Sequence, residues 1–358
     1  MEHRIKKLQN NLRSDYQAFL ITSDVNRFYY TGFCSSAGCV LVTKSKAYLL
    51  VDFRYIEAAQ SKVKHCKVIM FKKLCDSIKD ICTDEHITEI FVEEENVTLA
   101  QANNLKNDFS KFGVTLSHDK LLDAIIKNQR VVKSQDEIAM IKKAQLITEQ
   151  AYTEVLNYVK PGVTEREIVL ELEYLMRKKG ADGVSFSLIT ITGKNTSLPH
   201  GEPGDNAIKE GDFFLSDIGA LYNGYHSDMT RTVAVKHATD EMINIYDIVL
   251  KAQKNALEQV KSGVRAEVVD SAARSLISAN GYGDMFGHST GHGVGLDIHE
   301  QPNVSPKSEG LLSSGMIITV EPGIYIPDKF GVRIEDMVLV TENGYENFAT
   351  IDKSLVIV

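Results

Sequence analysis

Short apolar segments alternate with amphipathic segments through the first 120 residues, a pattern typical of an α/β domain. The apolar segments predict strands at 18–21, 39–42, 47–51, 67–71, 89–92 and 114–116. The amphipathic segments predict helices near 24–30, 73–82 and 98–110, with Asp24 expected to cap the first. After residue 132, Ser134 and Glu137 form a capping box that opens a long helix to about residue 158. The pattern therefore predicts an α/β domain over 1–125 and a second domain over 133–358.

The second domain contains a predicted hairpin that carries two acidic residues. The strand-like runs 211–220 and 226–235 flank Asn223-Gly224, and Asn-Gly is the strongest short hairpin signal. With that turn, Asp217 lies opposite Thr230, and Asp217 and Asp228 share one face as diagonal neighbours. Two solvent-facing acids are the alternative, but Asp217 lies in a strongly apolar strand.

A second predicted hairpin repeats this arrangement. The strands 315–323 and 332–340 flank a turn-rich segment at 327–331, so Glu321 and Glu335 are expected to lie directly opposite each other. Like charges in that position destabilise a sheet unless something positive lies between them. A salt bridge from Glu335 to Arg333 is an alternative. Four acids on two hairpins indicate a pair of divalent cations, and hence a hydrolase.

A glycine-rich segment offers imidazole ligands beside these acids. Three of the ten histidines, His288, His292 and His299, fall within residues 287–300. The glycines allow close approach of the backbone around a site. A lone histidine is more often an ordinary core or surface residue, but three of them beside glycines favour a functional site. The residues alone do not say which histidine binds metal.

Two short strings in the second domain indicate an internal duplication. Val159–Val163 and Val260–Val264 each precede a predicted helix, about 101 residues apart. Asp217 and Glu321 each follow a glycine by six residues, and these glycines are about 104 residues apart. Two halves related by a pseudo-twofold axis would bring both acidic hairpins to one central site. Chance similarity between short strings is the alternative.

Composition narrows the possible functions. The 358 residues carry a net charge of −8 without a basic tract, which argues against nucleic-acid binding. The chain has neither the apolar start of a signal peptide nor an apolar run long enough to span a membrane. Neither a Gly-x-Gly-x-x-Gly motif nor a phosphate loop is present, so a nucleotide site has little support. Five cysteines without a Cys-x-x-Cys motif are typical of free thiols in the cytoplasm.

The motifs together resemble the pita-bread metallopeptidases, within which the chain is similar to the Xaa-Pro branch of aminopeptidase P and prolidase. They are Leu215–Gly219, Ser227–Arg231, Gly291–Gly295 with His299–Glu300, Val320–Gly323 and Val332–Asp336. The resemblance covers the full length of the chain. It implies an α/β creatinase-like N-terminal domain, followed by an α+β pita-bread catalytic domain with pseudo-twofold symmetry.

The resemblance also implies roles for individual residues. Two divalent metal ions are expected, held by Asp217, Asp228, His292, Glu321 and Glu335. Glu321 is expected to move the proton of the attacking water, while His299 and His200 donate to the developing oxyanion. Substrate contacts are expected from His288, Tyr325 and Arg333. An oxygen-rich ligand set favours Mn²⁺, with Co²⁺ and Zn²⁺ as alternatives.

The implied activity is metal-dependent hydrolysis of the amino-terminal Xaa-Pro bond of peptides. A prolidase, the alternative, must bind the free carboxylate of a dipeptide, for which an arginine fork is well suited. The stretch from Gln301 to Gly310 offers only Lys307, which favours an aminopeptidase. A non-catalytic pita-bread module is a distant alternative, because such relatives lose metal ligands whereas this chain keeps all five. The resemblance further implies a homodimer that acts on proline-containing peptides, and the free thiols indicate the cytoplasm.

Overall fold

A computed structural model describes residues 1–117 and 119–358, which form two compact units, Met1–Arg130 and Val131–Val358. The division falls in helix α6 (Leu121–Val131), within the stretch that separates the two predicted domains. The sequence pattern did not predict this helix. Its buried side chains, Leu122, Ile125 and Ile126, recur at helical spacing, so the periodicity was present in a segment interpreted only as a boundary.

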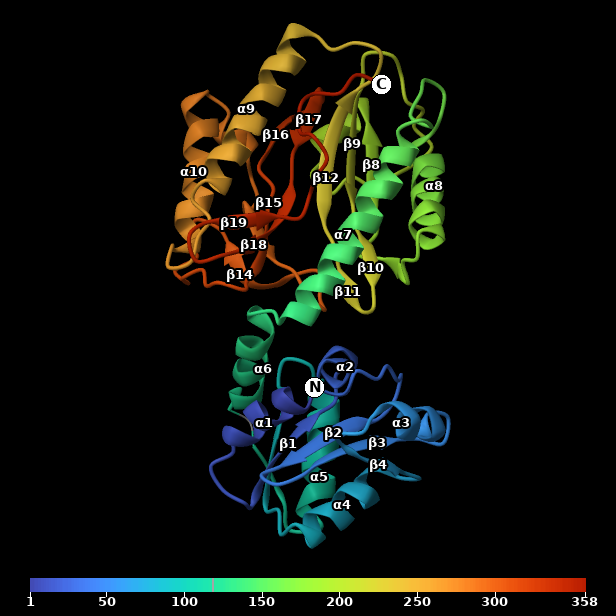
Figure 1. The fold of residues 1–358 in the computed structure, drawn as a ribbon, viewed down its shortest axis with the longest axis vertical. Coiled ribbons are helices and arrows are strands. Elements are labelled where there is room, and N and C mark those ends of the chain that lie inside the picture. The colour runs from blue at the N-terminus through green and yellow to red at the C-terminus, as the bar shows by residue number, and fades with distance from the viewer. Residues whose placement is uncertain (118) are drawn as a thin grey trace. The chain divides into compact units, whose positions relative to one another are not determined.

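The first unit is built around a six-stranded mixed sheet with the strand order β4-β3-β2-β1-β5-β6. Figure 1 labels β1 to β4 of this sheet. The strands are β1 (Gln17–Ile21), β2 (Cys39–Thr43), β3 (Ala47–Val51), β4 (Lys67–Met70), β5 (Glu89–Val92) and β6 (Thr115–Ser117). The helices are α1 (Glu2–Asn10), α2 (Asp24–Thr31), α3 (Ile56–Lys62), α4 (Leu74–Asp84) and α5 (Leu99–Ser110). The predicted α/β class is therefore confirmed.

The predicted cap of helix α2 was wrong by one residue. Ser23 is the N-cap, and its hydroxyl accepts a hydrogen bond from the Asn26 amide. Asp24 is instead the first residue of the helix, where its carboxylate pairs with Arg27. A hydroxyl in the cap position and an acid in the first turn are both favoured at a helix N-terminus, so the two adjacent residues divide these roles.

The second unit contains two successive helix–helix–sheet halves. The first half comprises α7 (Gln135–Val155) and α8 (Glu165–Lys178), with strands β7 (Gly183–Val184), β8 (Ile189–Thr192), β9 (Phe213–Ile218), β10 (Ala220–Tyr222), β11 (Tyr225–His226) and β12 (Met229–Ala234). The second comprises α9 (Asp240–Leu257) and α10 (Ala266–Ala279), with strands β13 (Gly291–Gly293), β14 (Glu300–Val304), β15 (Ile317–Val320), β16 (Gly323–Ile326), β17 (Phe330–Arg333), β18 (Asp336–Val340) and β19 (Tyr345–Asn347). Short 3₁₀ turns lie at Gly193–Ser197 and Gly283–Met285.

Equivalent backbone hydrogen bonds relate the two halves at the predicted offsets. Before α8, the Gly162 amide donates to the Ile208 carbonyl at 2.9 Å, and before α10 the Gly263 amide donates to the Leu312 carbonyl at 2.8 Å. Likewise, the Gly211 amide donates to Val235 and the Gly315 amide to Val340. The same connections therefore lead from the helices to each acidic hairpin, as a duplication requires.

Both predicted hairpin registers are confirmed. Asp217 pairs with Thr230 between β9 and β12. Val320 pairs with Asp336, and Gly323 pairs with Arg333, so Glu321 and Glu335 lie opposite each other between these pairs. The predicted strand 315–323 is interrupted there, since β15 ends at Val320 and β16 begins at Gly323. The two glutamates thus lie at a break between two ladders.

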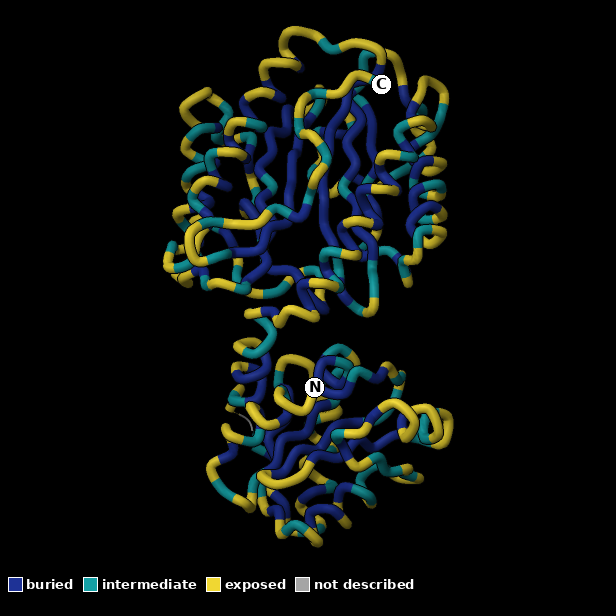
Figure 2. The backbone as a smooth tube through the Cα atoms, in the orientation of Figure 1, coloured by how far each residue is buried: buried dark blue, intermediate teal, exposed yellow. Residues whose placement is uncertain are grey.

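The interior of the second unit is formed by strands covered by amphipathic helices (Figure 2). One large buried cluster lies around α9, α10 and the second set of strands, and another lies around α7, α8 and the first set. None of the helices in the described part of the chain has both the length and the apolar character needed to cross a bilayer.

Candidate metal centre

One cavity of about 480 Å³ gathers nine of the ten predicted site residues. They are His200, Asp217, Asp228, His288, His292, His299, Glu321, Arg333 and Glu335. The tenth, Tyr325, is buried next to them: its hydroxyl accepts a hydrogen bond from Arg333 and lies 2.8 Å from Nε2 of His288. Residues more than a hundred positions apart in the sequence therefore meet at one site.

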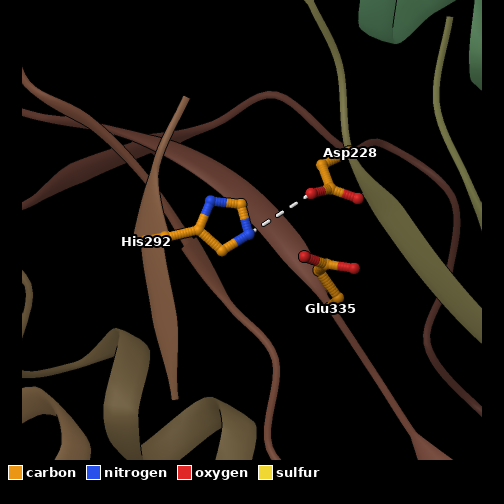
Figure 3. A group of neighbouring side chains, drawn as sticks. All are labelled: Asp228, His292 and Glu335. Atoms are coloured by element: carbon orange, nitrogen blue, oxygen red, sulfur yellow. Dashed lines mark ion pairs between the residues drawn. The ribbon is translucent and has the colours of Figure 1, made fainter. Parts of the chain in front are cut away.

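The five predicted ligands come from both halves of the repeat. Asp217 lies on β9, and Asp228 immediately precedes β12. His292 lies on β13, while Glu321 and Glu335 occupy the break between the ladders of the second hairpin. Ligand atoms of Asp228, His292 and Glu335 all lie within 4.8 Å of one another (Figure 3). This spacing suits three donors around one cation.

The His292 ring is oriented by the backbone carbonyl of the next residue, Gly293. Its Nδ1 lies 3.0 Å from the Gly293 carbonyl, which can only accept, so the proton is on Nδ1. The lone pair of Nε2 then points toward Asp228 and Glu321, whose carboxylate oxygens lie at 3.5 and 3.6 Å. Burial lowers the pKa of His292 to about 4. The ring is therefore neutral at pH 7, as a metal ligand must be, and its approach to Asp228 in Figure 3 is not a charged pair.

Arg333 is the one cationic side chain among the residues that line this cavity. Its guanidinium donates to Asp217 at 2.7 Å, to the Tyr325 hydroxyl at 2.8 Å and to the Thr230 hydroxyl at 3.1 Å. The alternative salt bridge from Arg333 to Glu335 is not formed. Glu335 instead accepts a hydrogen bond from the Thr230 hydroxyl at 2.7 Å.

Burial and mutual repulsion favour the protonated forms of three acids. Burial, reinforced by Glu335 and Asp217, raises the pKa of Asp228 well above its ordinary value. Burial, with Glu321 and Asp217, does the same to the pKa of Glu335. The pKa of Glu321 rises to about 8, again mainly through burial, although Arg333 opposes the shift. Without a positive partner, these carboxylates cannot all be charged at neutral pH.

Two buried acceptor atoms indicate what that partner is. Oδ1 of Asp217 and Oδ1 of Asp228 are both buried without a hydrogen-bond partner. Buried polar atoms are nearly always satisfied, and an unmatched carboxylate oxygen suits a cation better than a further hydrogen-bond donor. Four carboxylates, one neutral imidazole and one guanidinium leave an excess of negative charge. The donor set therefore fits divalent metal ions.

Several residues of the site were not predicted. Thr230 could have been found, because the predicted hairpin register already placed it opposite Asp217. Phe186 and Ile298, which line the cavity, lie in irregular segments, and no periodicity indicates where their side chains point. Asn303, on β14, lines the cavity through a strand that the pattern did not distinguish.

Comparison with known proteins assigns both parts of the chain to known families. The model of metallopeptidase family M24 matches residues 139–342, and that of the creatinase/prolidase N-terminal domain matches residues 4–132. A relative named Xaa-Pro dipeptidase, from Pyrococcus furiosus, is 39% identical and aligns over 99% of this chain and 100% of its own.

Solved structures agree with this placement over nearly the full length. One, described as an Xaa-Pro dipeptidase from Bacillus anthracis, superposes with a TM-score of 0.95 at 35% identity, covering 99% of both chains. Another, an X-Pro aminopeptidase from Thermotoga maritima, superposes with a TM-score of 0.91 at 37% identity, covering 96% of this chain and 98% of its own. The chain therefore belongs to metallopeptidase family M24 and carries the creatinase/prolidase N-terminal domain.

Proposed function

We propose that this protein hydrolyses the amino-terminal Xaa-Pro bond of peptides, with its metal ions held by Asp217, Asp228, His292, Glu321 and Glu335. The observation that carries the proposal is the convergence of these five side chains on one cavity, with two buried carboxylate oxygens lacking partners. The printed names of the relatives, Xaa-Pro dipeptidase and X-Pro aminopeptidase, support the same bond specificity.

We further propose two divalent ions, with Mn²⁺ as the preferred metal. Four carboxylates and one imidazole form an oxygen-rich set, which suits Mn²⁺ better than a site that requires thiolates; Co²⁺ and Zn²⁺ remain compatible. When bound, such ions supply Lewis-acid polarisation of a carbonyl and lower the pKa of water.

The chain's own residues supply the proton transfers. Glu321 lines the cavity, and its carboxylate, once its proton has left on metal binding, can receive a proton from the attacking water. The leaving nitrogen of proline is a tertiary amide without a hydrogen, and Glu321 can return the proton to it. His299 and His200 line the cavity and can donate to the oxygen of the scissile carbonyl as its negative charge develops.

Apolar side chains form another part of the cavity wall. Phe186, Ile189 and Ile298 line it together with the polar residues. An apolar wall of this kind fits the methylene groups of a proline ring and keeps bulk water away from the reacting bond.

The same proposal extends to the assembly and to the compartment. Cys39, Cys66 and Cys82 are buried thiols, which supports a reducing, cytoplasmic environment.

By resemblance to the Xaa-Pro branch, we propose a homodimer. Sedimentation velocity at micromolar concentration tests this, and a fully active monomer would contradict it.

Replacing Asp228 by Asn should remove both metal and activity. The substitution preserves shape but removes the negative charge of one of the three ligands that lie within 4.8 Å of one another. We expect Mn²⁺ content, measured by mass spectrometry after desalting, to fall, and Xaa-Pro cleavage to fall by roughly a hundredfold or more. Asp284→Asn, an exposed acid of the same unit, is the control and should change neither. Full turnover by Asp228→Asn would show that the metal site is assigned to the wrong residues.

Metal binding should depend strongly on pH. Glu321, with a pKa of about 8, retains its proton near pH 7, and the pKa values of Asp228 and Glu335 are shifted in the same direction. Protons must leave when a cation binds, so Mn²⁺ affinity should rise from pH 6 to pH 8. In the metal-free protein these pKa values are higher when folded than when unfolded. The folded state therefore binds the extra protons, and its stability should fall as pH rises from about 4.5 to about 8.

Titration calorimetry in buffers of different ionisation enthalpy measures the proton release directly. Glu321→Gln carries no titratable proton at this position and should release fewer protons at pH 7. Equal heats in all buffers for the unmodified protein would contradict the predicted protonation.

Longer peptides should be preferred over dipeptides. The free carboxylate of a dipeptide needs a cationic partner, yet Arg333, the one arginine among the described residues that line the cavity, is held by Asp217. Lys307 is exposed and is not among the lining residues, and Asn303 is neutral. These positions support an aminopeptidase, with a dipeptidase as the alternative that the relatives' names keep open.

The test compares kcat/KM for an Xaa-Pro dipeptide and for the same peptide extended by two residues. We expect the extended peptide to be favoured by about tenfold, the equivalent of one charge-assisted contact of roughly 1.4 kcal/mol. Asn303→Arg, which adds a planar fork at the cavity wall, should narrow that ratio. A strong preference of the unmodified protein for the dipeptide would make it a prolidase while leaving the metal site unchanged.

A further inference from the structure

A buried carboxylate outside the cavity holds the loop that carries His200. Glu165 is the first residue of α8, and its side chain is fully buried. Its Oε1 accepts hydrogen bonds from the Thr192 amide and the Asn195 side chain, both at 2.9 Å. Its Oε2 accepts from the Gly204 amide at 2.9 Å and from the Asn206 side chain at 3.3 Å. One side chain thus ties together both ends of the segment 192–206.

The arrangement satisfies the buried charge with neutral donors. Each oxygen accepts from one backbone amide and one asparagine amide, and the first turn of a helix favours an acid at this position. A buried carboxylate is stable only when it is paired or fully hydrogen-bonded. The carboxylate is thus stabilised when the loop is in place, and the loop is in turn held by the carboxylate.

The tethered segment forms part of the cavity. Pro199 and His200 line it, and the Pro199 carbonyl accepts a hydrogen bond from Arg333 at 3.2 Å. His200 is exposed, so little packing holds its ring, and its place over the site depends on where the backbone of the loop lies.

The second half of the unit uses the same device for its own histidines. Asp270, on α10, accepts hydrogen bonds from the amide and the hydroxyl of Thr290, and it pairs with Arg274. Arg274 also donates to the carbonyls of Phe286 and His288. In each half, a buried acid on the second helix therefore holds a loop that carries histidines to the cavity.

We propose that Glu165 is a positioning residue for His200, acting on the reaction through the loop 192–206. The inference rests on the proposed peptidase function, because it gives His200 a part in the chemistry. A displacement of about 1 Å in such a group is enough to slow a reaction by up to a hundredfold.

Glu165→Gln tests the tether with little change in volume. The NH2 group of glutamine donates and cannot accept, so it must face two donors in the place of one former carboxylate oxygen. We expect faster hydrogen exchange in 192–206, unchanged metal content and a fall in kcat/KM of about tenfold, carried mainly by kcat. Glu167→Gln is the matched control, because it alters the capping box two residues along the same helix without touching the loop. It should change neither hydrogen exchange in 192–206 nor kcat/KM.

A double-mutant cycle with His200→Ala separates positioning from general destabilisation. If Glu165 acts through His200, Glu165→Gln should cause no further loss of kcat in the His200→Ala background. If the losses of kcat in the two single variants instead multiply in the double variant, the proposal is overturned. Unchanged hydrogen exchange in 192–206 of Glu165→Gln would also overturn it, as would faster exchange with unchanged kcat. If Glu165→Gln does not fold, Asn195→Ala removes a single donor from the loop side and should shift exchange and kcat in the same directions.

The exchange measurement requires no substrate, so the two hypotheses fail differently. Unchanged exchange in Glu165→Gln counts against the tether alone. An unmodified, metal-loaded protein without Xaa-Pro activity would overturn the proposed function, and the positioning role with it, whatever the exchange pattern.

Discussion

The structure of the second unit depends on holding four carboxylates together in a buried cavity that contains one guanidinium. Burial alone raises the pKa of such groups, and each added acid raises the pKa of its neighbours further. The fold therefore has to bring these acids together against an unfavourable electrostatic term, which explains why rigid strands, close backbone packing and tethered loops surround the cavity. The metal ions that the donor set fits would replace the missing positive charge.

Adjacent residues show how sharply the surroundings decide the charge of an acid. Glu335 faces the acid cluster, and its pKa is raised. Asp336, the next residue, is equally buried, and burial alone would raise its pKa as well. Arg231 and Lys353 outweigh that effect and lower the pKa of Asp336. At the start of β18, the chain thus places an acid that is paired inside the core directly after one that is directed to the cavity.

The sequence predicted those parts of the site that follow from local rules. The turn at Asn223-Gly224 determined the register that places Asp217 opposite Thr230, and the symmetry about the second turn placed Glu321 opposite Glu335. The motif resemblance supplied what local rules cannot, the choice of His292 among three histidines. Long-range packing could not be predicted from the sequence, because neither periodicity nor spacing indicates that Phe186, Ile298 and Asn303 line the same cavity. The hydrogen bonds of Glu165 with residues about 30 to 40 positions away were missed for the same reason.

The chemistry of hydrogen-bond donors explains how one arginine serves the cluster without pairing with every acid. A guanidinium can only donate, so the Thr230 hydroxyl must accept from Arg333. The single hydrogen of the Thr230 hydroxyl is then donated to Glu335. The arginine pairs with Asp217 by direct contact, whereas its hydrogen-bonded connection to Glu335 runs through this hydroxyl. Glu335 therefore gains a fixed orientation without a salt bridge to a cationic side chain, which leaves its carboxyl group free to bind a metal ion.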